Sequence, residues 1–229
     1  FTTQTITASG LPFDSDNELY YYNVFHLGNY WFFLQYSSQY YYINDGGTLW
    51  TKQSTNGNQP GSSWQDLTYL SENEVIIWYG NASVKATHNG SGQLSFQAWT
   101  TLPSFDGCVS EYKHDGAEGG IVYVYCSDNS SKSKLYSMDK CKTWKSFTTN
   151  GLLTGNYFNN TTLSVVYNNN TSCWYTIGPD QQSPFYSTLD PENGPWFLSQ
   201  IQYVTNDSNA PSLVYDHNND KFTYLYRYS

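Results

Sequence analysis

Five segments of the chain share one pattern, in which a short strand-like run is followed by a polar turn and then by a strongly aromatic or β-branched run. The second runs begin at intervals of 45, 46, 52 and 49 residues. Their starting positions are Asn29, Glu74, Gly120, Ser172 and Lys221. Such regular spacing predicts a repeat architecture in which each repeat is one unit of β-structure.

Four of these units continue into a second hairpin that ends on an aromatic residue. This residue lies 21, 22, 24 and 24 residues after the start of the second run, at Trp50, Phe96, Trp144 and Trp196. Four strands in about 45 to 50 residues are the size of a β-propeller blade. We therefore expect an all-β, five-bladed β-propeller that occupies residues 1–229 as a single domain.

The fifth unit runs out at Ser229 after two strands, and the Thr-rich segment Phe1–Ser9 is left unplaced. This segment alternates as a strand does. We expect it to complete the last blade and so close the ring. The alternative is donation of the segment to a neighbouring molecule by β-augmentation, which would be a route to self-association.

Composition supports a β-rich fold and excludes two classes of partner. Aromatic residues make up 19% of the chain and methionine occurs once, so residues that suit a pleated surface abound. The formal net charge is −9 and Arg227 is the single arginine, which argues against binding to nucleic acid or to anionic membranes. No apolar run approaches the roughly 20 residues that span a bilayer.

Eight Asn-x-Ser/Thr sequons lie between the strand-like segments. They begin at Asn81, Asn89, Asn129, Asn159, Asn160, Asn169, Asn170 and Asn206. A sequon that is used must face solvent in a secreted protein. We expect a secreted, extracellular glycoprotein in which Phe1 follows a removed signal peptide.

The segment SMDKCKTW, Ser137–Trp144, resembles the Asp-box, the Ser-x-Asp-x-Gly-x-Thr-Trp hairpin of sialidase-type β-propellers. Ser137, Asp139, Thr143 and Trp144 match this motif, whereas Cys141 replaces its glycine. Weaker copies at blade spacing keep Asp45, Gly47 and Trp50; Thr87, Asn89 and Phe96; and Ser187, Asp190 and Trp196. The resemblance implies a propeller whose box hairpins lie on the outer part of the blades.

A structural role for the box follows from its residue types. Short Asp and Ser side chains accept backbone N–H groups that a tight turn leaves unpaired, and a Trp buries a large apolar area. We therefore interpret Asp139 as structural. In this arrangement Cys108 and Cys126 flank one hairpin of the third blade, while Cys141 and Cys173 belong to the third and fourth. We predict disulfides Cys108–Cys126 and Cys141–Cys173, with the other two pairings left open.

Sialidase activity does not fit this chain, because that family holds the substrate carboxylate with three arginines and this chain has one. Five-bladed glycoside hydrolases are the stronger enzyme alternative. They need a pair of carboxylates, and the acidic residues of this chain could supply one. The acidic residues on or beside first-strand regions are Glu18, Glu74, Glu111 and Asp216. We interpret Glu18 and Glu74 as turn or strand-edge residues, and we expect no catalytic residue, metal ion or cofactor.

The leading functional prediction is a non-catalytic extracellular glycoprotein with a structural or adhesive role, including self-assembly as a surface or filament subunit. A glycan-binding lectin is the second interpretation. Trp64 and Trp99 lie outside the box positions, so they are candidates for stacking on carbohydrate. A five-bladed glycoside hydrolase is the third.

Deletion of Phe1–Ser9 separates ring closure from donation. We expect the truncated protein to unfold as an isolated monomer, because the last blade loses a strand. Circular dichroism and size-exclusion chromatography measure this. A folded monomer that no longer assembles would show that the segment is donated instead.

Overall fold

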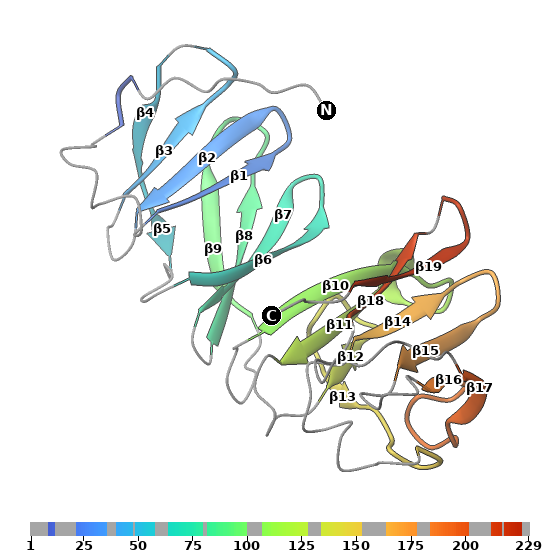
Figure 1. The fold of residues 1–229 in the computed structure, drawn as a ribbon. Helices are drawn as coiled ribbons and strands as arrows, with labels where there is room; N and C mark the ends of the chain where they lie inside the picture. The colour runs from blue at the N-terminus through green and yellow to red at the C-terminus, as the bar shows by residue number, and fades with distance from the viewer. Residues whose placement is uncertain are drawn as a thin grey trace. The chain divides into compact units, whose positions relative to one another are not determined.

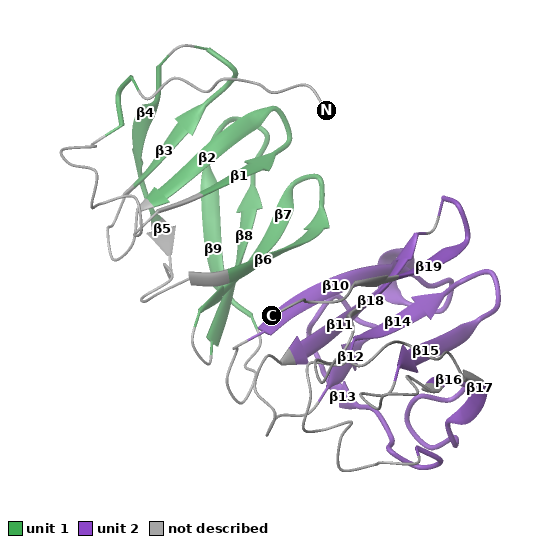
Figure 2. Ribbon diagram, viewed as in Figure 1, with its two compact units in different colours: residues 1–105 green, residues 106–229 purple. Residues whose placement is uncertain are grey.

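The computed structural model describes twelve stretches of the chain: residues 9–11, 22–35, 40–47, 49–57, 64–79, 82–99, 107–127, 134–152, 164–177, 184–201, 212–216 and 218–225. Their regular structure consists of β-strands and one short 3₁₀ turn at Glu118–Gly120, which confirms the all-β prediction (Figure 1). The chain divides into two compact units, unit 1 (residues 1–105) and unit 2 (residues 106–229) (Figure 2).

Unit 1 contains two sheets whose strands follow sequence order. The first sheet is β1 (Tyr22–Leu27), β2 (Tyr30–Gln35), β3 (Tyr40–Asn44) and β4 (Thr51–Ser54). The second is β6 (Trp64–Ser71), β7 (Glu74–Tyr79), β8 (Ala82–His88) and β9 (Leu94–Ala98). A short strand, β5 (Asn56–Gly57), pairs in parallel with β9 at the outer edge of the second sheet. The other pairings are antiparallel, as expected for hairpins.

Unit 2 contains three further antiparallel sheets. The third sheet is β10 (Gly107–Lys113), β11 (Ile121–Ser127), β12 (Leu135–Ser137) and β13 (Lys145–Ser146). The fourth is β14 (Val165–Asn168), β15 (Cys173–Ile177), β16 (Pro184–Thr188) and β17 (Phe197–Ile201). The fifth has β18 (Ser212–Asp216) and β19 (Lys221–Leu225). The second strand of each sheet begins within one residue of its predicted start.

Core layers form between consecutive sheets of each unit. In unit 1 one buried cluster combines side chains of both sheets, among them Phe25, Phe32, Ile43, Val75, Val84 and Phe96. In unit 2 two clusters join the third sheet to the fourth and the fourth to the fifth, through residues such as Val124, Tyr136, Trp174, Val166 and Leu213. Burial of one such side chain contributes about 1.5–3 kcal/mol, so stacking is the main stabilising interaction.

The turn between β12 and β13 shows how the residues that resemble the Asp-box act. Ser137 Oγ accepts the Cys141 N–H at 2.9 Å, and Asp139 Oδ1 accepts the Thr143 N–H at 2.9 Å. Asp139 Oδ2 also accepts the Thr143 hydroxyl at 2.7 Å. Burial acts to raise the pKa of Asp139, but the hydrogen bonds from Thr143 and Ser137 outweigh it and hold the pKa below its usual value. The carboxylate is thus occupied by its own turn.

Cys141, which stands where the Asp-box pattern has glycine, takes a left-handed backbone conformation. Its φ is 62°, that of Lys140 is 55°, and its side chain is fully buried. A non-glycine residue in this left-handed conformation costs roughly 1–2 kcal/mol. The hydrogen bond to Ser137 and the burial of the thiol offset this cost.

In the four larger sheets, the last residue of the third strand supplies a buried polar side chain to the turn that follows. These residues are Asn44, His88, Ser137 and Thr188. Asn44 Oδ1 accepts the Gly46 N–H at 2.7 Å, and Thr188 Oγ1 donates to the Asp190 carbonyl at 3.1 Å. The weaker copies of the motif are therefore shifted by one residue from the expected Thr87 and Ser187.

The predicted box acids and aromatic residues occupy these hairpins. Asp45 is exposed and accepts the Gly47 N–H at 3.2 Å, while Asp190 Oδ1 accepts two backbone N–H groups of its turn, each at 3.0 Å. Trp50 packs 5.9 Å from the Phe33 ring, and Trp144 packs 6.3 Å from the Tyr125 ring. The Trp196 indole N–H donates to the Thr148 carbonyl at 2.7 Å.

The segment that leads into a sheet is bonded to the terminal aromatic residue of that sheet. The Trp196 N–H donates to the Asn150 carbonyl at 2.7 Å, and the Trp50 N–H donates to the Ser9 carbonyl at 3.0 Å. A glycine with positive φ follows each carbonyl, Gly151 and Gly10, and a Cβ there would collide with the tryptophan carbonyl. Residues 9–11 in the first sheet therefore correspond to residues 150–152 in the fourth.

We expect Gly151→Ala to destabilise the protein by about 1–3 kcal/mol more than Gly120→Ala. Both glycines have positive φ, but an added Cβ meets the Trp196 backbone at Gly151 and nothing within 4 Å at Gly120. Urea unfolding of the two variants measures the difference. Equal losses of stability would show that the approach to Trp196 does not require glycine.

Candidate functional site

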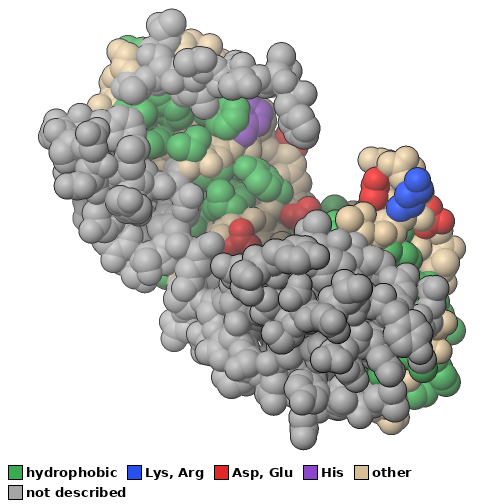
Figure 3. Space-filling view, in the orientation of Figure 1, with side chains coloured by type: hydrophobic (Ala, Val, Ile, Leu, Met, Phe, Trp, Pro, Cys, Tyr) green, Lys and Arg blue, Asp and Glu red, His purple; other side chains and the backbone are tan. Residues whose placement is uncertain are grey.

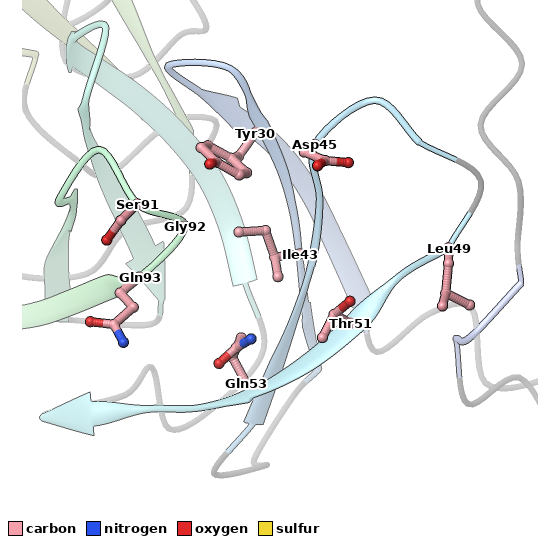
Figure 4. A pocket seen from close by; sticks show the side chains of 9 residues that line it. All are labelled: Tyr30, Ile43, Asp45, Leu49, Thr51, Gln53, Ser91, Gly92 and Gln93. Carbon is pink, nitrogen blue, oxygen red and sulfur yellow. The ribbon is translucent and has the colours of Figure 1, made fainter.

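A pocket of about 260 Å³ opens in unit 1 between the hairpin β3–β4 and the turn that joins β8 to β9 (Figure 4). Its lining residues are Tyr30, Ile43, Asp45, Leu49, Thr51, Gln53, Ser91, Gly92 and Gln93. Figure 4 shows the Ser91–Gln93 turn on one side of the opening and the side chains of β3 and β4 on the other. The site is therefore formed by two sheets together.

The strand alternation of β4 places Thr51 and Gln53 on the pocket side. On the opposite wall, the turn is held from within by Asn89. Asn89 Oδ1 accepts the Ser91 N–H at 2.9 Å and the Gln93 N–H at 3.1 Å, and Asn89 Nδ2 donates to Gln93 Oε1 at 3.2 Å. The wall is thus set before any ligand arrives.

Two buried side chains tie this turn to its surroundings. The Gly92 N–H donates to Nε2 of His88 at 2.9 Å. The Leu94 N–H donates to the Tyr41 hydroxyl at 3.0 Å, and that hydroxyl donates to the Gly92 carbonyl at 3.5 Å. Burial raises the pKa of Tyr41, against the effect of the Leu94 N–H, so this group stays protonated near neutral pH.

Glycine suits position 92 because of the backbone conformation there. Its φ is +84°, which strains a residue that has a side chain. A Cβ would also come within 2.5 Å of Ile43 Cδ1, so the end of the Ile43 side chain, which lines the pocket, would have to move.

The pocket combines neutral hydrogen-bonding groups with an aromatic ring. Gln53 and Gln93 carry amides, Thr51 and Ser91 carry hydroxyls, and Asp45 supplies the one carboxylate of the lining. The partly buried Tyr30 adds an apolar ring. No lysine, arginine or histidine is among the nine lining residues, so the lining lacks the cations that bind phosphate or carboxylate. Amides and hydroxyls beside a ring suit a ligand with many hydroxyl groups.

The corresponding place in unit 2 is bridged by an ion pair. Lys145, which follows Trp144 as Thr51 follows Trp50, lies 2.7 Å from Glu192 in the β16–β17 turn. Glu192 is four residues after Thr188, as Gly92 is four residues after His88. Uncharged residues at both places leave the hairpins of unit 1 without such a bridge.

The acidic residues proposed for hydrolysis do not line this pocket. Glu74 is ion-paired with Lys85 at 2.9 Å, and Asp216 accepts the Asn218 N–H at 2.9 Å within its own turn. Glu111 is exposed on β10, and Glu18 lies outside the described residues. Among the residues that the structure describes, no three His, Cys, Asp or Glu side chains form a metal-binding group.

The residues proposed for stacking and glycosylation are only partly described. The Trp99 ring is half-buried and lies 4.4 Å from Lys85 Nζ, while the Trp64 side chain lies outside the described residues. Asn89 and Asn170 are exposed and Asn169 is half-buried. The remaining sequons, at Asn81, Asn129, Asn159, Asn160 and Asn206, lie outside the described residues.

Exposed apolar side chains occur in both units. Figure 3 shows hydrophobic side chains on the surface of unit 1. In unit 1 Val24 and Tyr69 are 43% and 39% exposed, whereas in unit 2 Leu189 and Phe197 are 72% and 63% exposed and line one cleft beside β16 and β17. None of the described helical segments is long and apolar enough to cross a membrane.

All four cysteines are thiols in the structure, but one predicted pair is well placed. Cys108 and Cys126 face each other directly in the β10–β11 register. Directly opposite residues have Cα atoms about 4.5–5.5 Å apart, which is within disulfide range. The Cys141 thiol is buried in the β12–β13 turn, whereas Cys173 lines a separate cleft beside β16 and β17.

We expect non-reducing peptide mapping to recover Cys108 linked to Cys126, because their register allows the bond without movement of the strands. The same map tests the predicted Cys141–Cys173 pair. Recovery of Cys108 linked to Cys141 would contradict both pairings.

Comparison with known proteins gives no information on the function of the pocket. No known family model and no curated protein matches the chain. A solved structure of Hsv2 from Kluyveromyces marxianus is similar, with 11% identity over 89% of this chain and 60% of that chain and a TM-score of 0.43. The chain therefore spans about 60% of the length of that protein.

Two galactanase structures are also similar. A putative exo-β-1,3-galactanase from Bifidobacterium bifidum has 11% identity over 94% of this chain and 90% of that chain, with a TM-score of 0.34. An exo-β-1,3-galactanase from Phanerochaete chrysosporium has 15% identity over 86% and 50%, with a TM-score of 0.32. Likenesses this distant carry no argument about activity.

Proposed function

We propose that the protein is a non-catalytic, secreted adhesive or structural glycoprotein that binds a neutral glycan in the pocket of unit 1. The observation that carries the proposal is the lining of this pocket. Amides, hydroxyls and one carboxylate surround a tyrosine ring, and none of the lining residues is a cation. Vicinal sugar hydroxyls both donate and accept hydrogen bonds, and the C–H face of a sugar packs on an aromatic ring.

The same lining favours binding over hydrolysis. Glycoside hydrolysis uses two carboxyl groups on either side of the scissile bond. Asp45 is the one acidic residue among those that line the pocket, and it already accepts the Gly47 N–H. A bound glycan would therefore be held without cleavage. The exposure of Asn89 and Asn170 supports glycosylation at these sequons.

The two stacked sheets of unit 1 and the three of unit 2 support a five-bladed propeller as the scaffold. Within unit 2, the first strand β14 lies beside the first strands β10 and β18, as inner strands of neighbouring blades do. Ser9–Leu11 corresponds to residues 150–152, which follow the outer strand β13. Ser9–Leu11 therefore lies where the chain leaves an outer strand, which is the position that ring closure or donation by Phe1–Ser9 requires. Residues 1–8 lie outside the described residues.

We expect Thr51→Lys to weaken glycan binding by at least about 100-fold, because the longer side chain fills the pocket and pairs with Asp45. Ser54→Lys is the matched control, since Ser54 is exposed on the same strand but faces away from the pocket. A glycan array identifies the ligand, and isothermal titration calorimetry compares the variants.

Equal glycan binding by the wild type and Thr51→Lys would contradict the proposal that the glycan binds in this pocket. A wild type that binds no glycan on the array would contradict the lectin function and leave the structural role. Recovery of the bound oligosaccharide in cleaved form would favour a glycoside hydrolase.

A further inference from the structure

His88 occupies the box position of the second sheet, where the other three sheets have Asn44, Ser137 or Thr188. It is 5% exposed, and its ring lies 5.0 Å from the Tyr30 ring and 5.5 Å from the Phe32 ring. Histidine is the one residue of these four that gains a charge as the pH falls from 7 to 5. The second sheet therefore has a titratable group where the others have a neutral one.

The hydrogen bonds of His88 define its protonation state. The Gly92 N–H donates to Nε2 at 2.9 Å, so Nε2 carries no proton. Nδ1 lies 3.4 Å from Asn73 Oδ1, which accepts the proton that Nδ1 then carries. The neutral Nδ1–H tautomer satisfies both contacts. A proton added to Nε2 would point at the Gly92 N–H, and two donors would then face each other.

Among the described residues, the titratable side chains on or beside the strands that pack against this ring include Tyr30 on β2, Tyr41 on β3, Lys85 on β8 itself, and Glu72 and Glu74 at the β6–β7 turn. Glu72 is exposed, and Glu74 is ion-paired with Lys85. Burial of the imidazole lowers its pKa. The folded protein thus favours the neutral ring.

We propose that His88 positions the Ser91–Gln93 wall of the pocket, and that protonation of His88 releases this wall and the bound glycan. Gly92 is both the hydrogen-bond donor to His88 and a lining residue, so the two events share one backbone group. The proton comes from solvent, and no covalent bond changes. This inference deepens the proposed function and rests on it for the identity of the ligand.

The direction of the pH dependence follows from the lowered pKa. The unfolded histidine titrates near pH 6.5 and the folded one at a lower pH, so the unfolded state binds more protons between these values. The stabilising contribution is complete above about pH 6.5 and is lost as the pH falls through the folded pKa. One pH unit below that pKa, about a tenth of the molecules keep the intact wall, and the affinity falls about tenfold.

The first experiment needs no ligand and compares the wild type with His88→Gln. Glutamine accepts the Gly92 N–H without titrating. In the wild type, we expect the ratio of closed to open Gly92 amide, measured by hydrogen exchange, to fall about tenfold for each pH unit and to reach one at the folded pKa of His88. NMR titration of the His88 imidazole should give the same midpoint. His88→Gln should keep its Gly92 protection over the same range.

Gly92 protection that is independent of pH in the wild type, or that falls equally in His88→Gln, would overturn the proposal. If His88→Gln does not fold, the coincidence of the two wild-type midpoints still decides it, because different midpoints would overturn it. Calorimetry with the array-identified glycan gives the second readout. Wild-type affinity should fall about tenfold per pH unit, while His88→Gln should change less than about twofold.

The two readouts separate this inference from the proposed function. A wild type that binds no glycan at any pH contradicts the proposed function, while Gly92 exchange still decides whether His88 releases the turn. Binding that is independent of pH contradicts the role of His88 and leaves the proposed function intact.

Discussion

A backbone bond ties the segment that leads into a sheet to the last hairpin of that sheet in both units. The Asn150 carbonyl accepts the Trp196 N–H, and Asn56–Gly57 pairs with Ser95–Phe96 in the same manner. A four-stranded sheet buries neither face alone, so its stability depends on the sheet beside it. These bonds hold the connecting chain against the next sheet, and the core clusters fill the space between.

Stacking also creates the candidate site. Tyr30, Ile43, Thr51 and Gln53 come from one sheet, while the Ser91–Gln93 turn comes from the next. The buried polar residue at the end of β8 holds that turn, just as Ser137 holds the turn of the third sheet. One position in the repeat therefore maintains the hairpin everywhere and in unit 1 also forms the wall of a pocket. The chemical identity of the residue there decides whether the hairpin responds to pH.

The repeat could be predicted from the sequence because strand, turn and aromatic residues recur at blade spacing. The second strands begin within one residue of the predicted positions. Thr188 and His88 were not identified as box residues, because a strand shifted by one residue turns every side chain to its other face. Ser187 consequently contacts Ser199 instead of closing the turn.

The pocket was beyond sequence reasoning for a different reason. Its two walls are about 40 residues apart in the chain and belong to separate sheets, so no local pattern brings Gln53 and Gln93 together. The sequence instead indicated Trp64 and Trp99 as carbohydrate-stacking residues, because they are large and lie outside the box positions. Hydroxyl and amide side chains are common in this chain, so those of the pocket carried no distinguishing signal.

The short strand β5 has a consequence beyond stacking. The outer strand of a sheet presents unpaired N–H and C=O groups, and these can recruit strands from other molecules into aggregates. Because β5 pairs with β9, the start of that edge is already occupied by the protein's own chain. The two residues of β5, which lie between the first two sheets in the chain, thus also protect the edge of the second sheet from pairing with other molecules.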